Sequence, residues 1–593
     1  MDARWLRRIS RRNILKAGGL IVATIGLQRM ANRLPHIAAQ PRSGGGPTLA
    51  ASLATDGPPD LILKNGQVYT MDAADTMAQA IAIKNGRIQA VASDQEIVAL
   101  AAPTTQIIDV GGRVVTPGFI DPHLHFRAWG LQNQYYVPFL PPAVRDTATL
   151  RAALQDVVAA TPAGEWILGY YLVMADKPIF TKEDLDPVSP NHPVFIMHIG
   201  GHWGTANSAA LAVAGVTAAT PSPQGGIIEK GPDGEPTGVF YNHRAMDVVR
   251  SYAPPITYEM VKSSILATQT LLAACGVTSF QDNNIRELEH IQAYQDLTQD
   301  GRLFLRNTLY LTLEWPADAS KISQVQRINN EVTRFAGFKF LIDGQGPTAY
   351  CYEPHNGTEW RMPTWEPNMF KQAIAQLHNT GLQICVHCIG DAAADLVLEA
   401  YEGAMNANPR SDPRHRLEHV ILTKPHTTQK IKDLGVVVST NPAFVYLFGD
   451  GWENIFGSAR MERIMVIKEW LQAGIHVTIG SDAPSTPFYT PQATLAGACT
   501  RQTYSQRVLG IEHRLTLAEA LRAHTIEAAY AAHEEGVKGS LEPTKFADIV
   551  VWAQDPATMT MPQLFQTTTV YMTLVGGKIV YPQSYAFVPF ARR

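Results

Sequence analysis

The sequence predicts an α/β protein, with a (β/α)8 TIM-like barrel and a flanking β-sandwich formed from the N- and C-terminal segments. Within residues 117–540, short apolar runs alternate with helical patterns, which is typical of βαβ units around a parallel sheet. Residues 56–116 and 541–593 contain short β-runs separated by turns instead. Because a barrel domain occupies about 250 residues or more, the middle of this 593-residue chain is long enough for one.

Composition excludes several classes of protein. Hydrophobic residues make up 46% of the chain and charged residues 17%, which are values of a folded protein with a large core, so extensive disorder is excluded. The net charge of −4 offers no basic surface for phosphates, and we expect no nucleic-acid partner. The cysteines number five, an odd count that cannot form the disulfide framework of a small secreted domain.

Residues 1–55 are predicted to be a signal peptide and linker. Arginines precede an apolar stretch at 17–27, which would span only about 16 Å as a helix and is too short for a bilayer. The run Ser10–Lys16 resembles the twin-arginine export motif. We therefore expect the twin-arginine export machinery as a partner and a periplasmic or extracellular location. The alternative is a frayed basic terminus, and the cleavage site stays open.

Both ends of the folded region have the pattern of β-hairpins. Asn65-Gly66 and Asn85-Gly86 each lie between short apolar runs, and Asn-Gly is the strongest short hairpin signal because both turn residues need positive φ. The C-terminal segment resumes this style from residue 548 to 580. Two half-sheets at opposite ends of a chain pair most simply into one β-sandwich. Two unrelated sheets are the alternative.

The middle of the chain contains apolar runs with the length and composition of buried strands. Examples are 194–198, 277–280, 338–342, 382–386, 417–421, 436–439 and 476–479. Helical patterns separate these runs, so they are predicted to be barrel strands. No glycine-rich dinucleotide or P-loop motif follows any of them, which argues against nucleotide binding.

The first candidate metal ligands follow the apolar pair at 119–120. His123 and His125 lie two positions apart, and side chains at i and i+2 of a strand share a face. Imidazole is well suited to Zn²⁺, so the two histidines could supply half of a tetrahedral site. A His-x-His pair alone is a weak signal, because surface histidines show the same spacing.

Further candidate ligands occur at the ends of other predicted strands. His387 ends one apolar run, His419 lies in another, and Asp482 follows a third. Lys339 lies inside the run 338–342, where an unpaired ammonium would be costly. Each of these residues alone could be an ordinary polar group near a strand end. Because parallel barrels gather such residues at their C-terminal mouth, the whole set predicts a metal site.

Taken with these residues, the sequence resembles the amidohydrolase superfamily from about residue 60 to 582. More narrowly, it is similar to the branch that contains N-substituted formamide deformylases. Motifs along the whole of this stretch carry the similarity. They are Pro117–His125, Gly200–His202 with Asn207–Leu211, Phe338-Lys339 with Asp343-Gly344, His387 with Gly390-Asp391, His419, Gly480–Asp482, and Lys538–Pro543 with Ala547–Val550.

The resemblance implies the barrel and sandwich, and one or two divalent metal ions, usually zinc. His123 and His125 would bind the first ion, and His387 and His419 the second. Lys339 would be carboxylated by CO2 and bridge both ions. Chemistry agrees, because a protonated lysine cannot be a ligand whereas its carbamate offers an anionic oxygen. The alternative, an unmodified Lys339 with a single ion, stays open.

The resemblance also implies a mechanism. Asp482 would contact the first ion and act as general base, so that metal-bound hydroxide attacks an amide carbonyl and the proton then passes to the departing nitrogen. His202 and Asn207 would bind the substrate. Asp343 and Asp391, each beside a glycine in turn-like sequence, are expected to support or cap neighbouring backbone.

The predicted function is hydrolysis of a non-peptide C–N bond in a small-molecule amide, with an N-substituted formamide or another N-acyl amide as the candidate substrate. Rivals in the same fold are a cyclic amide hydrolase and a ring-amidine deaminase. Deaminases of the superfamily often lack the bridging lysine, so Lys339 argues against the latter. A rival of another class is a catalytically silent, exported ligand-binding barrel, which would not need Asp482. A homodimer is expected only by analogy with the superfamily.

Overall fold

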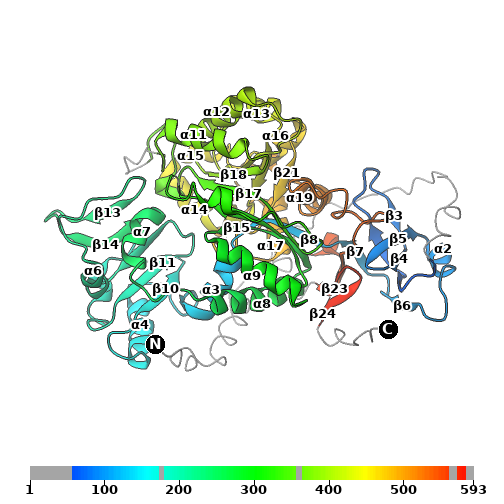
Figure 1. Cartoon of the computed structure of the whole chain (residues 1–593), viewed down its shortest axis with the longest axis horizontal. Coiled ribbons are helices and arrows are strands. Elements are labelled where there is room, and N and C mark those ends of the chain that lie inside the picture. Colours follow the sequence, from blue (N-terminus) through cyan, green and yellow to red (C-terminus); the bar gives the residue numbers. More distant parts are fainter. Residues whose placement is uncertain (1–56, 173–178, 315, 356–362, 560–569, 583–593) are drawn as a thin grey trace.

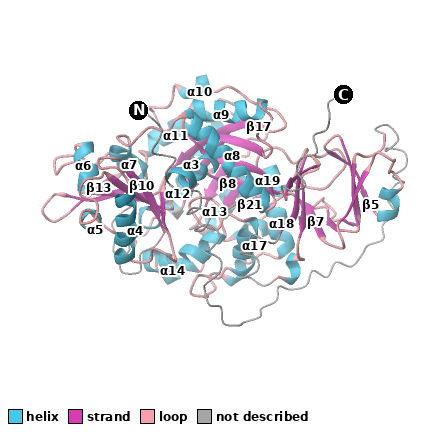
Figure 2. Ribbon diagram, turned by 90° about the horizontal axis from the view of Figure 1, so that it is seen from below, coloured by secondary structure: helices cyan, strands magenta, loops and turns pink. Residues whose placement is uncertain are grey.

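The computed structural model describes residues 57–172, 179–314, 316–355, 363–559 and 570–582. The predicted signal peptide and linker, residues 1–55, lie outside the described residues. The barrel occupies the middle of an elongated molecule, with a separate sheet at one end and two flanking sheets at the other (Figure 1). A view turned by 90° shows the same three parts (Figure 2). Among the described residues, no helix combines the length and apolar composition that a membrane span requires.

Eight parallel strands form the central sheet, and each pairs with the next along the chain. They are β8 (Phe119–Leu124), β15 (Val277–Ile285), β16 (Arg306–Thr312), β17 (Thr333–Leu341), β18 (Gln383–Cys388), β19 (Arg416–His419), β20 (Val437–Thr440) and β21 (Val477–Ile479). The last strand returns to the first, because the Asp482 N–H donates to the His123 carbonyl over 2.8 Å. The sheet is therefore a nearly closed barrel, as the sequence predicted.

Helices cover the outside of the barrel. Those that contact its strands are α3 (Phe126–Tyr135), α8 (Tyr258–Ala274), α9 (Leu288–Gln299), α11 (Pro367–His378), α12 (Asp391–Ala407), α16 (Ile467–Gln472), α18 (Leu517–Ala523) and α19 (Ile526–Tyr530). On β17, the ring of Phe340 packs outward against Phe370 of α11, with ring centroids 6.3 Å apart. Because successive side chains of a strand alternate between its faces, the neighbouring Lys339 points into the barrel.

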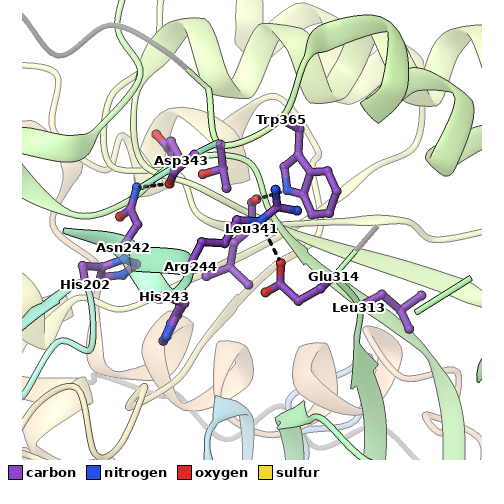
Figure 3. A pocket seen from close by; sticks show the side chains of 11 residues that line it. His202, Asn242, His243, Arg244, Leu313, Glu314, Leu341, Asp343 and Trp365 are labelled. Carbon is purple, nitrogen blue, oxygen red and sulfur yellow. Dashed lines mark hydrogen bonds and ion pairs between the residues drawn. The ribbon is translucent and has the colours of Figure 1, made fainter. Parts of the chain in front are cut away.

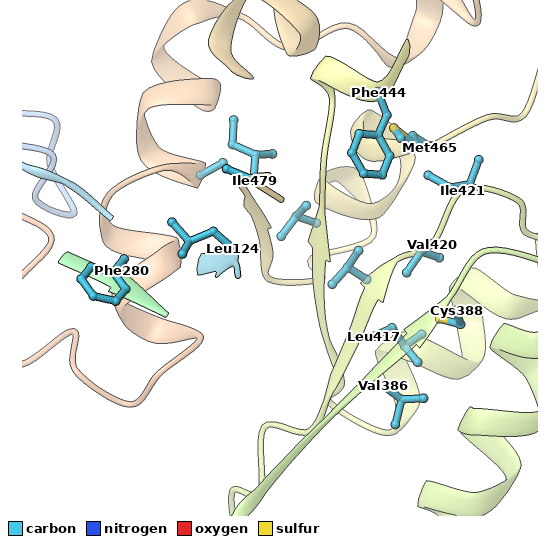
Figure 4. Packing of buried hydrophobic residues seen from close by; sticks show 14 of the residues in the cluster. Leu124, Phe280, Val386, Cys388, Leu417, Val420, Ile421, Phe444, Met465 and Ile479 are labelled. Atoms are coloured by element: carbon cyan, nitrogen blue, oxygen red, sulfur yellow. The ribbon is translucent and has the colours of Figure 1, made fainter. Parts of the chain in front are cut away.

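A large apolar cluster contains side chains from several barrel strands and from the helix after β20 (Figure 4). Val386, Leu417 and Ile479 come from barrel strands, and Phe444 comes from α14 (Ala443–Phe456). Parallel barrel strands are buried on both faces, which explains why they read as nearly continuous apolar runs. Each large apolar side chain buried here contributes roughly 1.5–3 kcal/mol, so the strand ends that carry the polar residues are held by a large core.

A second sheet is inserted between β8 and β15, in the order β13-β14-β12-β11-β10-β9. Its strands are β9 (Val137–Phe139), β10 (Ile167–Tyr171), β11 (Val194–His198), β12 (Trp203–Ala206), β13 (Ile227–Lys230) and β14 (Pro236–Tyr241). Strand β10 pairs in parallel with β9 and β11, and the other pairs are antiparallel. Helices α4 (Thr147–Ala160), α6 (Ser208–Ala214) and α7 (Asn242–Arg250) supply apolar residues to its two faces.

The run 194–198 was predicted to be a barrel strand, and this prediction is wrong, because the run forms β11 of the inserted sheet. Val194 and Ile196 pack into one apolar cluster, and Phe195 packs into another on the opposite face. Since both faces are covered, β11 is apolar throughout, just as a barrel strand is. Composition alone therefore could not separate the two environments.

The two ends of the chain meet in the flanking sheets. One sheet has the order β5-β4-β1-β6, and the other has the order β24-β23-β22-β7-β2-β3. The strands are β1 (Leu61–Lys64), β2 (Gln67–Tyr69), β3 (Met77–Ala78), β4 (Ala80–Lys84), β5 (Arg87–Ala92), β6 (Gln106–Asp109), β7 (Val114–Pro117), β22 (Ile549–Trp552), β23 (Val570–Val575) and β24 (Lys578–Tyr581).

Strand β7 from the N-terminal segment pairs antiparallel with β22 from the C-terminal segment, with Val115 opposite Val551. Leu63 and Ile83 of the first flanking sheet share an apolar cluster with Val115 and Leu574 of the second. The predicted pairing of the two chain ends is confirmed. The alternative of two unrelated sheets is wrong.

Candidate metal centre

The side chains that the sequence suggested as metal ligands converge at the C-terminal ends of the barrel strands. They are His123 on β8, His125 directly after β8, Lys339 on β17, His387 on β18, His419 on β19 and Asp482 just after β21. Barrel enzymes place their active sites at this end of the barrel. All of these residues except the half-buried His125 are buried, so the centre is largely shielded from solvent.

Asp482 and His123 lie at the middle of this group. Asp482 Oδ1 lies 3.0 Å from His125 Nε2 and 3.4 Å from His123 Nε2, and Lys339 Nζ lies 3.2 Å from His123 Nε2. The ring of His419 has its centroid 4.6 Å from that of His123 and 4.5 Å from that of His387. His123, His419 and Asp482 each offer one ligand atom, and these atoms all lie within 4.8 Å of one another.

The donor set fits a divalent metal ion. His387 Nε2 is a buried nitrogen without a hydrogen-bond partner among the described residues. Burial lowers the pKa of His419 to about 3 and holds the pKa of His387 well below its ordinary value, so both rings are neutral. Neutral imidazole and carboxylate are the nitrogen and oxygen ligands that zinc prefers.

The backbone at two of the strand ends is strained. His419 has φ 74°, Val420 has φ 50° and Asp482 has φ 56°, all in the left-handed region that non-glycine residues seldom adopt. Such conformations cost of order 1–3 kcal/mol each and persist only where the surroundings enforce them. Here the Val420 N–H donates to the Cys388 carbonyl over 3.0 Å. The barrel framework therefore holds His419 and Asp482 in conformations that they would not adopt alone.

A buried ion pair supports His123 from behind. Glu418 accepts a hydrogen bond from His123 Nδ1, so that His123 Nε2 faces the centre. Arg416 donates from Nε to Glu418 Oε1 over 2.7 Å and from Nη2 to Glu418 Oε2 over 3.0 Å. Burial alone would raise the pKa of Glu418, but the adjacent guanidinium of Arg416 holds it well below its usual range. The carboxylate is therefore ionised and orients the imidazole.

Asn441, which follows β20, does the same for His419. His419 Nδ1 lies 2.7 Å from Asn441 Oδ1, and Asn441 Nδ2 donates to the Gly480 carbonyl over 3.0 Å. Since Nδ2 is the donor to Gly480, Oδ1 accepts from His419, and His419 Nε2 is left for the centre. Sequence reasoning missed both Glu418 and Asn441. The sequence signal that could have found them is that each is a polar residue in or after an apolar run, beside or near a candidate ligand.

Asp343 and Asp391 support backbone, as predicted. Asp343 is buried after β17, and its carboxylate accepts the N–H groups of Tyr350, Ile389 and Gly390. Burial raises the pKa of Asp343 to about 7, and its Oδ1 lies 3.6 Å from His387 Nε2. Asp391 Oδ1 accepts the N–H of Tyr352 over 3.1 Å.

His202 lies beside the centre, on a turn of the inserted sheet. The ring of His202, in the turn between β11 and β12, lies 5.0 Å from the ring of His387. His198 Nδ1 accepts the Gly200 N–H over 3.1 Å, and the Gly201 N–H donates to the His198 carbonyl over 2.8 Å. Gly201 has φ 76°, which a glycine adopts without strain. A tight turn therefore places His202 beside the candidate ligands, where a substrate-binding residue is expected.

Asn207 has a different role from the predicted one. Its Oδ1 accepts the N–H groups of Val194 and Ala210 over 2.9 Å, the second as the N-cap of α6. Its Nδ2 donates to the carbonyls of Ser189 and His192 over 3.0 and 2.8 Å. The amide is fully buried and wholly used by local backbone. The prediction that Asn207 binds substrate is therefore wrong, because a helix cap occupies its polar atoms.

The fold and the site together define a metal-dependent hydrolase of the barrel type, and comparisons with known proteins agree. The model of the amidohydrolase family matches residues 106–581. An N-substituted formamide deformylase from Arthrobacter pascens is 27% identical over 553 residues, which cover 88% of this chain and 99% of that protein.

Solved structures show the same fold. An uncharacterized metal-dependent hydrolase from Pyrococcus horikoshii OT3 superposes with a TM-score of 0.68 at 22% identity, covering 84% of this chain and 99% of that one. A mutant of atrazine chlorohydrolase from Arthrobacter aurescens TC1, complexed with zinc and atraton, gives a TM-score of 0.50 at 16% identity, covering 88% and 94%.

The chain belongs to the amidohydrolase family. It is an enzyme, a hydrolase that acts on carbon–nitrogen bonds other than peptide bonds.

Proposed function

We propose that this enzyme hydrolyses the C–N bond of a small non-peptide amide, an N-substituted formamide or another N-acyl amide. The convergence of the histidines with Asp482 in one centre at the barrel mouth carries the proposal. The relative named N-substituted formamide deformylase supports the amide class, because the match extends over 99% of its length.

The proposed cofactor is zinc, with His123 and His125 as ligands of a first ion and His387 and His419 as ligands of a second. When bound, zinc would lower the pKa of a water molecule and polarise a carbonyl group. Lys339, carboxylated by CO2, would bridge the two positions. Burial lowers the pKa of the Lys339 ammonium, which favours the neutral amine that reacts with CO2. A single ion with an unmodified Lys339 is the alternative.

Asp482 is the proposed proton carrier. Its carboxylate, 3.0 Å from His125 Nε2 and 3.4 Å from His123 Nε2, would take the proton that water releases on attacking the carbonyl carbon. The same carboxyl group would then donate that proton to the departing nitrogen. His202 would hold the substrate beside His387. Phe444, stacked over His419 with ring centroids 5.8 Å apart, would keep water from that side.

The test is an assay of formate release from N-butylformamide and N-benzylformamide by the zinc-loaded protein, together with elemental analysis. We expect turnover by the wild type and a loss of roughly 10²–10⁴-fold in kcat for Asp482→Asn, assayed with zinc in excess because Asp482 is also a candidate ligand. Asp296→Asn, at a half-buried position near the C-terminal end of α9, serves as the matched control and keeps full activity. A zinc-loaded wild type that cleaves neither formamide nor an N-acetyl analogue contradicts the proposal.

We also propose that the enzyme acts outside the cytoplasm, after export by the twin-arginine machinery. The Arg11-Arg12 pair before a short apolar stretch supports this proposal. Fractionation of cells that express the wild type or an Arg11→Lys/Arg12→Lys variant tests it. Retention of the variant alone in the cytoplasm is the expected result, and identical location of both proteins contradicts export by this route.

A further inference from the structure

A surface cavity lies at the N-terminal ends of two barrel strands, away from the candidate metal centre. Its volume is about 280 Å³. Arg334 of β17 and Gln383 of β18 line it, and the loops nearby add Gly381, Leu382, Arg410 and His533. Lys339 lies five residues beyond Arg334 on β17, so roughly 16 Å of strand separate the cavity from the centre. The two features are therefore at opposite ends of the barrel.

Arg410 is fixed in the wall of this cavity by its guanidinium group. Nη1 donates to the carbonyls of His378 and Leu382 over 3.2 and 3.0 Å, and Nη2 donates to the Gly381 carbonyl over 2.7 Å. Because Gly381 and Leu382 line the cavity themselves, the charged end of Arg410 lies there, and not only its aliphatic stem. Nε has no hydrogen-bond partner among the described residues and is not fully buried. Burial lowers the pKa of Arg410, so this guanidinium group would gain from an anionic partner.

Arg334 borders the same space from the start of β17. Its Nη1 donates to the Ala532 carbonyl, and the next residue, His533, lines the cavity. Its Nε and Nη2 have no hydrogen-bond partner among the residues that the structure describes, and neither atom is fully buried. Two guanidinium groups from separate segments, each with unused N–H donors, therefore border one cavity.

The acidic side chains near these two arginines are already paired with other cations. Asp412 and Glu535 lie 2.8 and 2.9 Å from nitrogens of Arg414, and Glu534 lies 2.9 Å from Lys538 Nζ. Within the described part of the chain, neither cavity arginine forms an ion pair. The cavity therefore carries positive charge without a counter-charge.

The cavity beside the candidate metal centre has the opposite character (Figure 3). Its volume is about 20 Å³, and Arg244 Nε lies 3.2 Å from Glu314 Oε2, so its arginine is neutralised. A cavity needs about 10–15 Å³ to hold one water molecule, so this one holds little more than a water molecule. The cavity of Arg334 and Arg410 admits a group of several non-hydrogen atoms. Size and charge together make it the better site for an anion.

A guanidinium group can donate two parallel N–H bonds to the oxygens of one phosphate or carboxylate group. Two such groups match a ligand that carries two negative charges. We propose that this cavity binds a small dianionic oxyanion, inorganic phosphate or a short dicarboxylate, between Arg334 and Arg410. The bound anion connects the loop before β18 with the loop after α19 and stabilises this end of the barrel by mass action.

Isothermal titration calorimetry of the zinc-loaded protein with phosphate, succinate and acetate, at constant ionic strength, tests this proposal. We expect phosphate or succinate to bind at least tenfold more tightly than acetate, and the tighter of the two identifies the kind of oxyanion. Arg334→Gln and Arg410→Gln should each weaken that binding at least tenfold. Arg460→Gln is the matched control, because Arg460 also donates to backbone carbonyls, those of Phe456 and Pro354, but does not line this cavity. It should keep the wild-type affinity.

An anion can also bind zinc, but binding at the metal centre would survive both arginine substitutions. An affinity that neither substitution changes therefore overturns the proposal, and so does a wild type that binds neither dianion more tightly than acetate. If the glutamine variants do not fold, His533→Asp decides. This change keeps both guanidinium groups and adds a carboxylate at an exposed position beside Arg334, and aspartate tolerates the left-handed φ of 57° there. Binding of the dianion should fall at least tenfold in this variant, and unchanged binding overturns the proposal.

Discussion

Replacement of Glu418 by glutamine tests whether the residues behind the candidate ligands tune metal binding. Glutamine keeps the shape of Glu418 but removes the charge that His123 Nδ1 and Arg416 share. Loss of a carboxylate that orients a metal-binding histidine typically weakens metal affinity by about 10–100-fold. This range corresponds to about 1.4–2.7 kcal/mol.

The same change also leaves Arg416 buried without a counter-charge, which costs about 3–5 kcal/mol of stability. Asp548→Asn separates the two effects, because Arg306 and Asp548 form a similar buried pair, with Nε and Oδ2 2.7 Å apart, away from the candidate ligands. Both variants should unfold more easily than the wild type in urea. Only Glu418→Gln should show weaker zinc binding in competition with a fluorescent chelator.

An unchanged zinc Kd for Glu418→Gln would refute this reasoning. A similar loss of zinc affinity in Asp548→Asn would do so as well, because affinity would then follow general stability rather than the orientation of His123.

Other predictions concern zinc, one buried histidine pair and Asn207. Removal of zinc by EDTA should lower the free energy of unfolding by about 4 kcal/mol relative to protein held at a thousandfold excess over the zinc Kd, and an unchanged Tm contradicts a bound ion. His415 Nε2 lies 2.8 Å from His378 Nδ1, and burial, with His378 beside it, holds the pKa of His415 well below its ordinary value. Unfolding therefore takes up a proton below about pH 6.5. The free energy of unfolding, measured by urea titration, should fall from pH 7 to pH 5, and should fall less in His415→Gln. An equal fall in the wild type and the variant contradicts this. Asn207→Ala should cost about 1–3 kcal/mol of stability while kcat/KM of the folded enzyme stays within twofold, and a large selective rise in KM would restore its role in substrate binding.

Much of the site could be predicted from the sequence, because a parallel barrel brings together the residues at the C-terminal ends of its strands, however far apart they lie along the chain. Each candidate ligand lies within or shortly after an apolar run, and the ends of parallel strands meet at one mouth. Lys339 was also recognisable, because an unpaired ammonium inside an apolar run would be costly. The structure places it on the face of β17 opposite the outward-facing Phe340.

Other parts depend on contacts that periodicity does not encode. Strand β11 is covered on both faces, so Val194–His198 has the composition of a barrel strand although it lies in another sheet. The polar atoms of Asn207 could serve a ligand or a helix cap, and only the folded positions of Val194 and Ser189 decide for the cap. Glu418 was overlooked because a charged residue beside His419 is expected to face solvent. Only the structure shows that it is buried in the barrel interior.

An anomalous difference map at the zinc absorption edge shows whether side chains from distant strands bind one metal centre. For crystals of the zinc-loaded enzyme, we predict a peak about 2.0–2.2 Å from a ring nitrogen of His123 and from an oxygen of Asp482. A zinc peak elsewhere in the molecule, with none between these two residues, would contradict the proposed metal centre.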